Sequence, residues 1–298
     1  MRTNLVLGAT GAVGQFLLPQ LLARDERVIG ISRSPAGADQ AGIDWLQGDL
    51  FGTMPPLPAV DVVYSLGPLE AFANWLPRAL AEQTSVPAHA APTRIIAFSS
   101  MSAESKQASI DAAERELAAR LASAEQRLFA CAREHAIACT VFRPTLIYGS
   151  GRDRSLAPLA RFARRWRVLP IPQGASGLRQ PVHAGDLAAA CLAARDVAAT
   201  FGNTYPLGGG ERLRFDAMLK RIARTAHALA LPIPRALARM ARGRFGAGAL
   251  ARMTSDLVAD NASAARDFGY APRDFVATDV PGPQQTGAAQ PAASATVV

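Results

Sequence analysis

Lysine is nearly missing from this chain of 298 residues, in which Lys106 and Lys220 are the only two. Arginine therefore carries almost all of the positive charge behind a formal net charge of +8. A basic balance of this size is compatible with a nucleic-acid partner, but no nucleic-acid-binding motif accompanies it. The arginine bias points instead to the nucleotide composition of the gene, so nucleic acid is not an expected partner.

The densest basic cluster surrounds Trp166. We interpret it as a solvated helix face and keep contact with an anion or a membrane surface as the alternative. Its members are Arg161, Arg164, Arg165 and Arg167.

Cysteine is scarce as well. The three cysteines are scattered and lack CxxC spacing, which argues against a disulfide framework or a metal site. They are predicted to be small buried hydrophobes in a reducing compartment, which makes the cytoplasm the expected location. The sequence also lacks an apolar run of membrane-spanning length, and no basic segment followed by an apolar core opens it. We therefore expect no membrane span, no secretory signal and no metal ion.

The most informative feature that is present is the glycine-rich stretch 8–14, directly after the apolar run 5–7. Residues 2–7 are predicted to form a buried strand and 11–24 a helix. Glycines at this junction allow a tight turn, the approach of a pyrophosphate and close helix packing. The helix N-terminus directs free N–H groups and its positive dipole end at the anion. The predicted phosphate site consists of Gly8, Thr10, Gly11, Ala12, Val13 and Gly14.

Apolar strands alternate with helical patterns through the first half of the chain. The predicted strands are 27–32, 43–47, 60–66, 94–98 and 138–143, and the predicted helices are 69–83 and 110–135, the latter opened by a capping pair of Asp111 and Glu114. This alternation predicts an α/β fold, a Rossmann-type doubly wound parallel sheet with ligands at the C-terminal strand ends. Residues 99–106 are expected to be a polar loop.

The regularity falls off after residue 148, where prolines and glycines predict a smaller C-terminal substrate lobe. Its predicted elements are helices at 186–195 and 215–229 and a strand with a turn at 205–210. The expected divisions are an NAD(P)-binding domain over 1–150, a segment 178–200 that packs back on it, a lobe over 151–277 and a disordered tail over 278–298.

The residue at the end of the second predicted strand bears on the choice between NAD and NADP. A site for NAD places an acidic side chain here to bind the ribose hydroxyls, whereas Arg33 suits the 2′-phosphate of NADP. An exposed arginine without a ligand is the alternative. Asp49 is placed to accept a hydrogen bond from the adenine amino group. The further residues of the predicted cofactor site are Leu50, Leu66, Gly67 and Ser99.

Several motifs in a fixed order resemble the extended short-chain dehydrogenase/reductase family, which includes sugar-nucleotide epimerases and dehydratases. The resemblance covers residues 2–276, and its motifs are GxxGxxG at 8–14, GDL at 48–50, FSS at 98–100, RPTLIYG at 143–149, PVHAGDLA at 181–188 and FGNTYPLGGGE at 201–211. It implies that Pro144 lies by the nicotinamide and that Arg179 and His183 border the substrate lobe. A structural histidine is the alternative that we favour for His183.

The chemistry of that family needs a Tyr-x-x-x-Lys pair on one face of the long helix. The lysine lowers the tyrosine pKa, so that the phenol exchanges a proton with the substrate near neutral pH. None of the four tyrosines here has a lysine four residues later. With Glu125 as the anchor, the expected positions fall on Leu117 and Leu121, and the usual Ser/Thr falls on Met101. The usual active site is therefore missing.

A serine-rich segment offers a substitute. Ser100 and Ser102 with Lys106 form a candidate Ser–Lys proton relay after a strand end. A solvated loop with an exposed lysine is the alternative, which we favour. Tyr64 is a second candidate for the nicotinamide, although strand tyrosines more often belong to the core.

Two functions from different classes follow. The first is an atypical oxidoreductase or epimerase/dehydratase-like enzyme that uses NADP, with NAD as the other cofactor compatible with the sequence, on an unknown small molecule. The second is a catalytically silent NAD(P)-binding sensor or assembly protein with a protein partner or a second copy of itself. The full-length substrate lobe favours the enzyme, and the leucines on the long helix favour the sensor.

Overall fold

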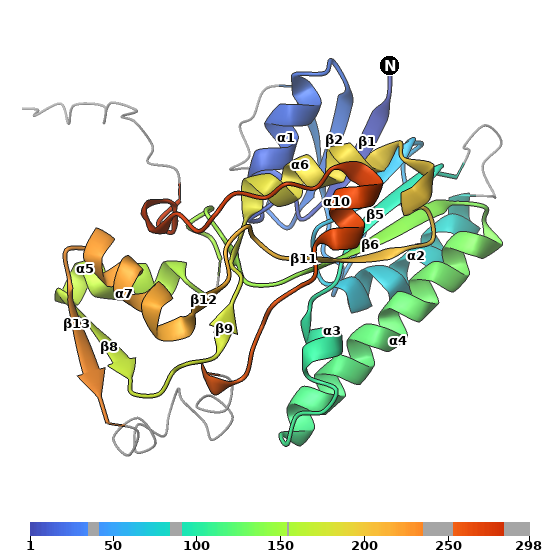
Figure 1. Cartoon of the computed structure of the whole chain (residues 1–298). Helices are drawn as coiled ribbons and strands as arrows, with labels where there is room; N and C mark the ends of the chain where they lie inside the picture. The colour runs from blue at the N-terminus through green and yellow to red at the C-terminus, as the bar shows by residue number, and fades with distance from the viewer. Residues whose placement is uncertain (35–41, 84–90, 154, 235–252, 283–298) are drawn as a thin grey trace, which may run out of the picture.

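The computed structural model describes residues 1–34, 42–83, 91–153, 155–234 and 253–282 (Figure 1). Its central sheet contains β1 (Thr3–Leu7), β2 (Arg27–Ser32), β3 (Ile43–Gln47), β4 (Val62–Ser65), β5 (Arg94–Phe98), β6 (Ala138–Pro144) and β11 (Thr204–Leu207). All neighbouring strands are parallel, in the order β11-β6-β5-β4-β1-β2-β3. The strand order reverses between β1 and β4, which is where such sheets bind ligands. This confirms the predicted doubly wound Rossmann-type sheet.

Helices cover both faces of the sheet. One face carries α1 (Gly14–Leu22), α6 (Ala184–Arg195) and α10 (Ala262–Phe268), and the other carries α2 (Leu69–Gln83) and α4 (Ala112–Glu134). Strand β1 shows why its sequence is continuously apolar: Val6 packs into the first layer, while Leu5 and Leu7 pack into the second. A parallel strand buried on both faces needs hydrophobic residues in both directions.

The smaller lobe is built from two-stranded sheets, as the falling regularity of the sequence suggests. Strands β8 (Val168–Pro172) and β13 (Leu229–Ile233) pair and support α5 (Ala157–Trp166) and α7 (Phe215–Thr225). The pairs β7 (Ile147–Tyr148) with β10 (Val182–His183) and β9 (Leu178–Arg179) with β12 (Leu213–Arg214) join it to the sheet domain. Leu169, Ile171, Met218 and Ile222 form its core.

Two predicted elements differ from the structure. The helix predicted over 215–229 ends at Thr225, because His227 adopts a left-handed conformation (φ 51°) and Leu229 already begins β13. The loop predicted over 99–106 contains the short helix α3 (Ser102–Ser105).

The expected start of the long helix is confirmed in part. Asp111 caps α4 by accepting the Ala113 N–H at 3.0 Å. Glu114, the expected second member of the capping pair, instead accepts a hydrogen bond from Ser109.

Segments late in the chain return to the sheet domain. Strand β11 is an edge strand of the central sheet, and its Tyr205 packs edge to face on Phe268 of α10. Residues 278–282, which the sequence places in the disordered tail, begin within a short 3-10 helix, η3 (Ala277–Asp279), and Val280 is fully buried. The rest of that predicted tail, 283–298, lies outside the described residues.

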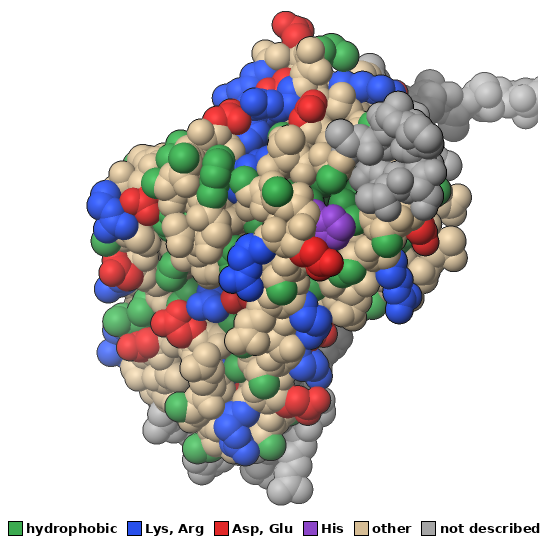
Figure 2. All heavy atoms as spheres, turned by 90° about the vertical axis from the view of Figure 1, so that its right-hand side faces the viewer, with side chains coloured by type: hydrophobic (Ala, Val, Ile, Leu, Met, Phe, Trp, Pro, Cys, Tyr) green, Lys and Arg blue, Asp and Glu red, His purple; other side chains and the backbone are tan. Residues whose placement is uncertain are grey.

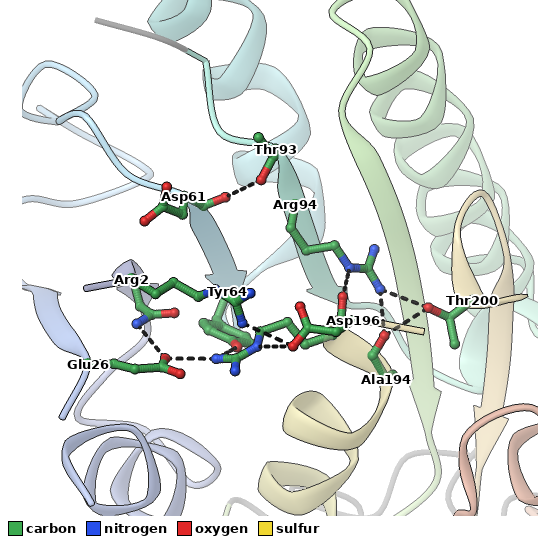
Figure 3. A network of polar contacts seen from close by, with 11 residues as sticks. Arg2, Glu26, Asp61, Tyr64, Thr93, Arg94, Ala194, Asp196 and Thr200 are labelled. Atoms are coloured by element: carbon green, nitrogen blue, oxygen red, sulfur yellow. Dashed lines mark hydrogen bonds and ion pairs between the residues drawn. The ribbon is translucent and has the colours of Figure 1, made fainter. Parts of the chain in front are cut away.

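A buried polar cluster ties the amino ends of the strands together (Figure 3). The guanidinium of Arg94, the first residue of β5, donates to the hydroxyls of Thr140 and Thr200 at 2.7 and 2.9 Å. Arg195 pairs with Glu26 at 2.7 Å and lies 3.5 Å from the hydroxyl of Tyr64, which is fully buried. Tyr64 therefore belongs to the core, on the central strand β4.

Candidate functional site

The glycine-rich loop leaves β1 at the carboxyl edge of the sheet. Gly8 has a φ of +79°, and the Gly11 N–H closes the turn on the Gly8 carbonyl at 2.9 Å. A Cβ on Gly11 would lie 2.9 Å from the Gly8 oxygen, and one on Gly14 would lie 2.1 Å from the Ala9 oxygen. Real Cβ atoms essentially never approach backbone so closely. All three glycines are therefore needed to form this turn.

The start of α1 suits an anion. Val13 at the N-cap provides no side-chain hydrogen bond, and the first turn contains no acidic residue. The N–H groups of Gln15 and Phe16 already donate to the carbonyls of Gly11 and Val13 at 3.3 and 3.0 Å, so what this turn offers an anion is the positive end of the helix dipole. The same turn holds Gln15, whose side-chain nitrogen is buried without a hydrogen-bond partner among the described residues. A pyrophosphate fits a cradle of this kind.

The end of β4 lies against this loop. A Cβ on Gly8 would lie 3.2 Å from the Leu66 carbonyl carbon and 3.3 Å from the Gly67 nitrogen. A Cβ on Gly67 would meet only Leu50, at 3.8 Å, so the space beside Gly67 is open. The structure thus brings together Gly8, Leu50, Leu66 and Gly67, four residues of the predicted cofactor site.

The remaining adenosine-side residues follow β2 and β3. Arg33 is exposed directly after β2, and its carbonyl accepts a hydrogen bond from Gln47 at 3.4 Å. Asp49 is half-buried, and its Oδ1 accepts the Phe51 N–H at 3.0 Å. These contacts hold the backbone and leave the Arg33 side chain in solvent.

A buried ion pair lies at the ends of β5 and β6, which the sequence did not predict. Glu125 on α4 accepts hydrogen bonds from the Ser99 hydroxyl at 2.5 Å and from the Arg143 guanidinium at 3.0 and 2.5 Å. The bond to Glu125 raises the pKa of Arg143. Pro144, the next residue, accepts the Met101 N–H at 3.1 Å. The arginine in the motif 143–149 and the glutamate on the long helix were the available signals.

The candidate relay residues have other partners. The Ser100 hydroxyl accepts the Ser102 N–H at 3.1 Å and so holds the first turn of α3. Lys106 pairs with Glu114 at 3.2 Å, with 22% of its side chain exposed. Within the described part of the chain, no contact joins Lys106 to either serine. The Ser–Lys relay stays a prediction.

The tyrosines are all described, and all are buried. Burial raises the pKa of Tyr148 and of Tyr205 to about 12, and it also raises the pKa of Tyr64 and Tyr270. A tyrosine that exchanges protons near neutral pH needs the opposite shift. Leu117 and Leu121 are half-buried on α4.

The two predicted substrate residues hold the backbone together. His183 is the N-cap of α6: its Nδ1 accepts the Gly185 N–H at 3.0 Å, and its ring packs on Phe16 and Tyr148. Burial lowers the pKa of His183. The guanidinium of Arg179 donates to the Ser255 carbonyl at 2.8 Å and lies over the Phe215 ring. Both residues are explained without a substrate, and their contact with one stays a prediction.

The surface away from this edge of the sheet carries charges of both signs (Figure 2). Figure 2 shows a face on which basic and acidic side chains are interspersed; on α2 and α4, Arg120 lies 3.1 Å from Glu70 and 3.2 Å from Glu116. On α5, Arg165 stacks over the exposed Trp166. The three cysteines are buried with free thiols.

The residues that the structure describes contain neither a group of three His, Cys, Asp or Glu side chains able to hold a metal nor a helix with the length and apolarity needed to cross a membrane.

Solved structures with a similar architecture include epimerases and dehydratases. The UDP-glucuronic acid 4-epimerase of Bacillus cereus, solved in complex with NAD, has a TM-score of 0.71 at 16% identity, over 94% of each chain. The dTDP-glucose 4,6-dehydratase of Bacillus anthracis, also solved with NAD, has a TM-score of 0.67 at 12% identity, over 94% of each chain. The chain therefore has the fold of these enzymes, which confirms the predicted resemblance at the level of the fold.

A relative in sequence is the mitochondrial NADH dehydrogenase [ubiquinone] 1 alpha subcomplex subunit 9 of Arabidopsis thaliana. It is 28% identical over an alignment of 229 residues that covers 68% of this chain and 53% of that protein. The match thus spans about half the length of that relative. No family model matches the sequence.

Proposed function

We propose that this chain binds a nicotinamide dinucleotide at the carboxyl edge of the sheet and uses it, as an epimerase- or dehydratase-like oxidoreductase, on a small molecule. The turn formed by Gly8, Gly11 and Gly14 below the open N-terminus of α1 carries the proposal. The likeness of the fold to two enzymes solved with NAD supports it.

The residues present suggest how the dinucleotide is held. The loop 8–14 takes the pyrophosphate, Asp49 and Leu50 the adenine, Leu66 and Gly67 the inner ribose, and Ser99 and Pro144 the nicotinamide end. NADP is preferred over NAD, because Arg33 is exposed where an NAD site has an acidic residue. The guanidinium is suited to a 2′-phosphate.

Proton transfer must then use groups other than the usual pair. A bound nicotinamide supplies or accepts the hydride. Among the chain's own groups, Ser99 is a hydroxyl at a strand end that is already bonded to the carboxylate of Glu125. Glu125, held by Arg143, fixes the position of this hydroxyl at the strand end. Ser100, Ser102 and Lys106 remain the second candidate group, and Arg179 and His183 remain the proposed border of the substrate.

Titration of tryptophan fluorescence with NADPH and NADH tests the proposal. We expect NADPH to bind more tightly, and Arg33→Gln to weaken NADPH binding about tenfold, the worth of one charge-assisted contact, without affecting NADH. Equal or tighter binding of NADH would refute the assignment of Arg33, and absence of binding by both would refute the dinucleotide site. Oxidation of bound NADPH by a panel of carbonyl compounds tests the enzyme. Binding without turnover would support the silent sensor instead.

A further inference from the structure

An arginine that is distant in sequence donates a hydrogen bond to the glycine-rich loop. The Nη1 of Arg152, just after β7, donates to the carbonyl of Thr10 at 2.5 Å across a sequence separation of 142 residues. Its side chain is exposed, and no carboxylate of the described residues forms an ion pair with it. A positive charge is thus held beside the phosphate cradle with most of its five N–H donors free.

The backbone around Arg152 is fixed on both sides. Gly151 has a φ of +67°, and a Cβ there would lie 2.2 Å from the Pro281 carbonyl oxygen, so residues 281–282 press directly on this loop. The Arg152 N–H donates to the Ser150 hydroxyl at 3.0 Å. On the other side, Asp153 caps α5 by accepting the N–H groups of Leu156 and Ala157. The position of Arg152 is therefore determined by the fold.

This placement complements the cradle. The first turn of α1 has the positive end of the helix dipole and no acidic residue, and Arg152 adds a full positive charge from the side of the lobe. A guanidinium binds two phosphate oxygens at once, which matches a pyrophosphate better than a single carbonyl. We infer that Arg152 binds the pyrophosphate of the dinucleotide and so closes the cradle from the lobe. This inference rests on the proposed dinucleotide site.

The role differs from that of Arg33 in what it recognises. Arg33 is proposed to read the 2′-phosphate, which only NADP carries. Arg152 is expected to contact the pyrophosphate, which NADH, NADPH and ADP-ribose share and adenosine 2′-monophosphate lacks. Binding of these four ligands therefore distinguishes the proposed role of Arg152 from that of Arg33.

The test compares Arg152→Gln with wild type in the full chain, by calorimetric titration of these four ligands. The glutamine keeps a donor for the Thr10 carbonyl and removes the charge. We expect the Kd of NADH, NADPH and ADP-ribose to rise about tenfold or more, as for loss of a charge-assisted bond, while adenosine 2′-monophosphate binds within twofold of wild type. Arg152→Lys should recover part of the loss. Arg164→Met, which removes an exposed charge on α5, should bind all four like wild type.

The outcomes are distinguishable. Unchanged NADH and ADP-ribose affinity in Arg152→Gln would overturn the role of Arg152 and leave the proposed dinucleotide site intact. An equal loss in Arg164→Met would show an effect of net charge and would also overturn it. If wild type binds neither NADH nor NADPH, the proposed function fails and this inference falls with it.

Discussion

Glu125 on α4 and Arg143 on β6 form a two-pronged ion pair in which the Glu125 side chain is only 6% exposed. The Ser99 hydroxyl is a third donor to the same carboxylate. The long helix is thereby fixed to β5 and β6 at the edge where the cofactor is proposed to bind. A carboxylate buried this deeply is stable only while these donors remain.

The first prediction concerns this pair. Glu125→Leu leaves Arg143 partly buried, with Glu104, at 3.5 Å, as its one remaining ion-pair partner among the described residues. We expect the free energy of unfolding to fall by about 3 kcal/mol, the low end for breaking a buried pair. Ser99→Ala should cost about 1 kcal/mol, the value of one hydrogen bond. Urea denaturation monitored by circular dichroism measures both.

Arg120→Ala is the matched control. It removes an arginine on the same helix whose ion pairs with Glu70 and Glu116 are exposed, so we expect a loss below about 0.5 kcal/mol. If Glu125→Leu is no more destabilising than this control, Glu125 is not the anchor of the strand ends.

The second prediction compares two glycine substitutions, one expected to destabilise the fold and one expected to affect only nucleotide binding. In Gly14→Ala the new Cβ would lie 2.1 Å from the Ala9 oxygen, so the turn must shift and the Tm should fall by about 5 °C or more, the shift for 1–2 kcal/mol in a domain of this size. Gly67→Ala meets only Leu50 at 3.8 Å, so its Tm should match that of wild type.

Nucleotide titration completes that comparison. The methyl of Gly67→Ala enters the open space proposed for the inner ribose, and we expect weaker NADPH binding at an unchanged Tm. If Gly67→Ala binds NADPH as wild type does, the ribose does not occupy this space.

The third prediction concerns Lys106. Its ion pair with Glu114 is partly buried, so Lys106→Met should lower the free energy of unfolding by about 1 kcal/mol or less. Because Lys106 is bound to Glu114 and to neither serine, we expect turnover to stay unchanged. The other lysine provides the control: Lys220→Met removes an exposed partner of Asp216 and should alter neither quantity. A loss of about 100-fold in kcat for Lys106→Met alone, the size of a general acid–base effect, would establish the relay.

Local patterns predicted the sheet domain closely. The strands 27–32, 43–47 and 94–98 and the helix 69–83 have the bounds found in the structure, because apolar runs between breakers determine them locally. The glycine-rich turn was largely local, since Gly11 and Gly14 are required by backbone contacts with residues 8 and 9, and Gly8 is required by its φ of +79°.

Features that depend on distant contacts could not be predicted in this way. The hydrogen bond between Arg152 and Thr10 joins residues 142 positions apart, which no local pattern indicates. Residues 278–282 look disordered by composition, but the lobe buries Val280 and fits Pro281 against Gly151. The motif at 181–188 singled out His183, for which a structural role was favoured, but its particular role as a cap depends on the Gly185 N–H and on two rings from other elements.

The fourth prediction uses the titration of His183. Burial lowers its pKa, with Arg273 as the next cause, and its Nδ1 must be unprotonated to accept the Gly185 N–H. In the unfolded chain the ring titrates with a pKa near 6.5. Below about pH 6.5 the unfolded state therefore binds more protons than the folded state, and stability falls as the pH drops. The Tm of wild type should fall as the pH is lowered from 7.5 to 5.5. This pH range lies above the range in which carboxylates ordinarily titrate.

His183→Asn isolates this effect, because asparagine keeps an N-cap acceptor but does not titrate. Its Tm should be lower throughout, since the ring contacts with Phe16 and Tyr148 are lost, and it should depend less on pH than that of wild type. His227→Asn is the control, since His227 is exposed and its left-handed conformation suits asparagine. That variant should keep the slope of wild type. If the Tm of wild type and of His183→Asn depended equally on pH, the pKa of His183 would be the same in the folded and the unfolded chain. The cap would then tolerate a protonated ring.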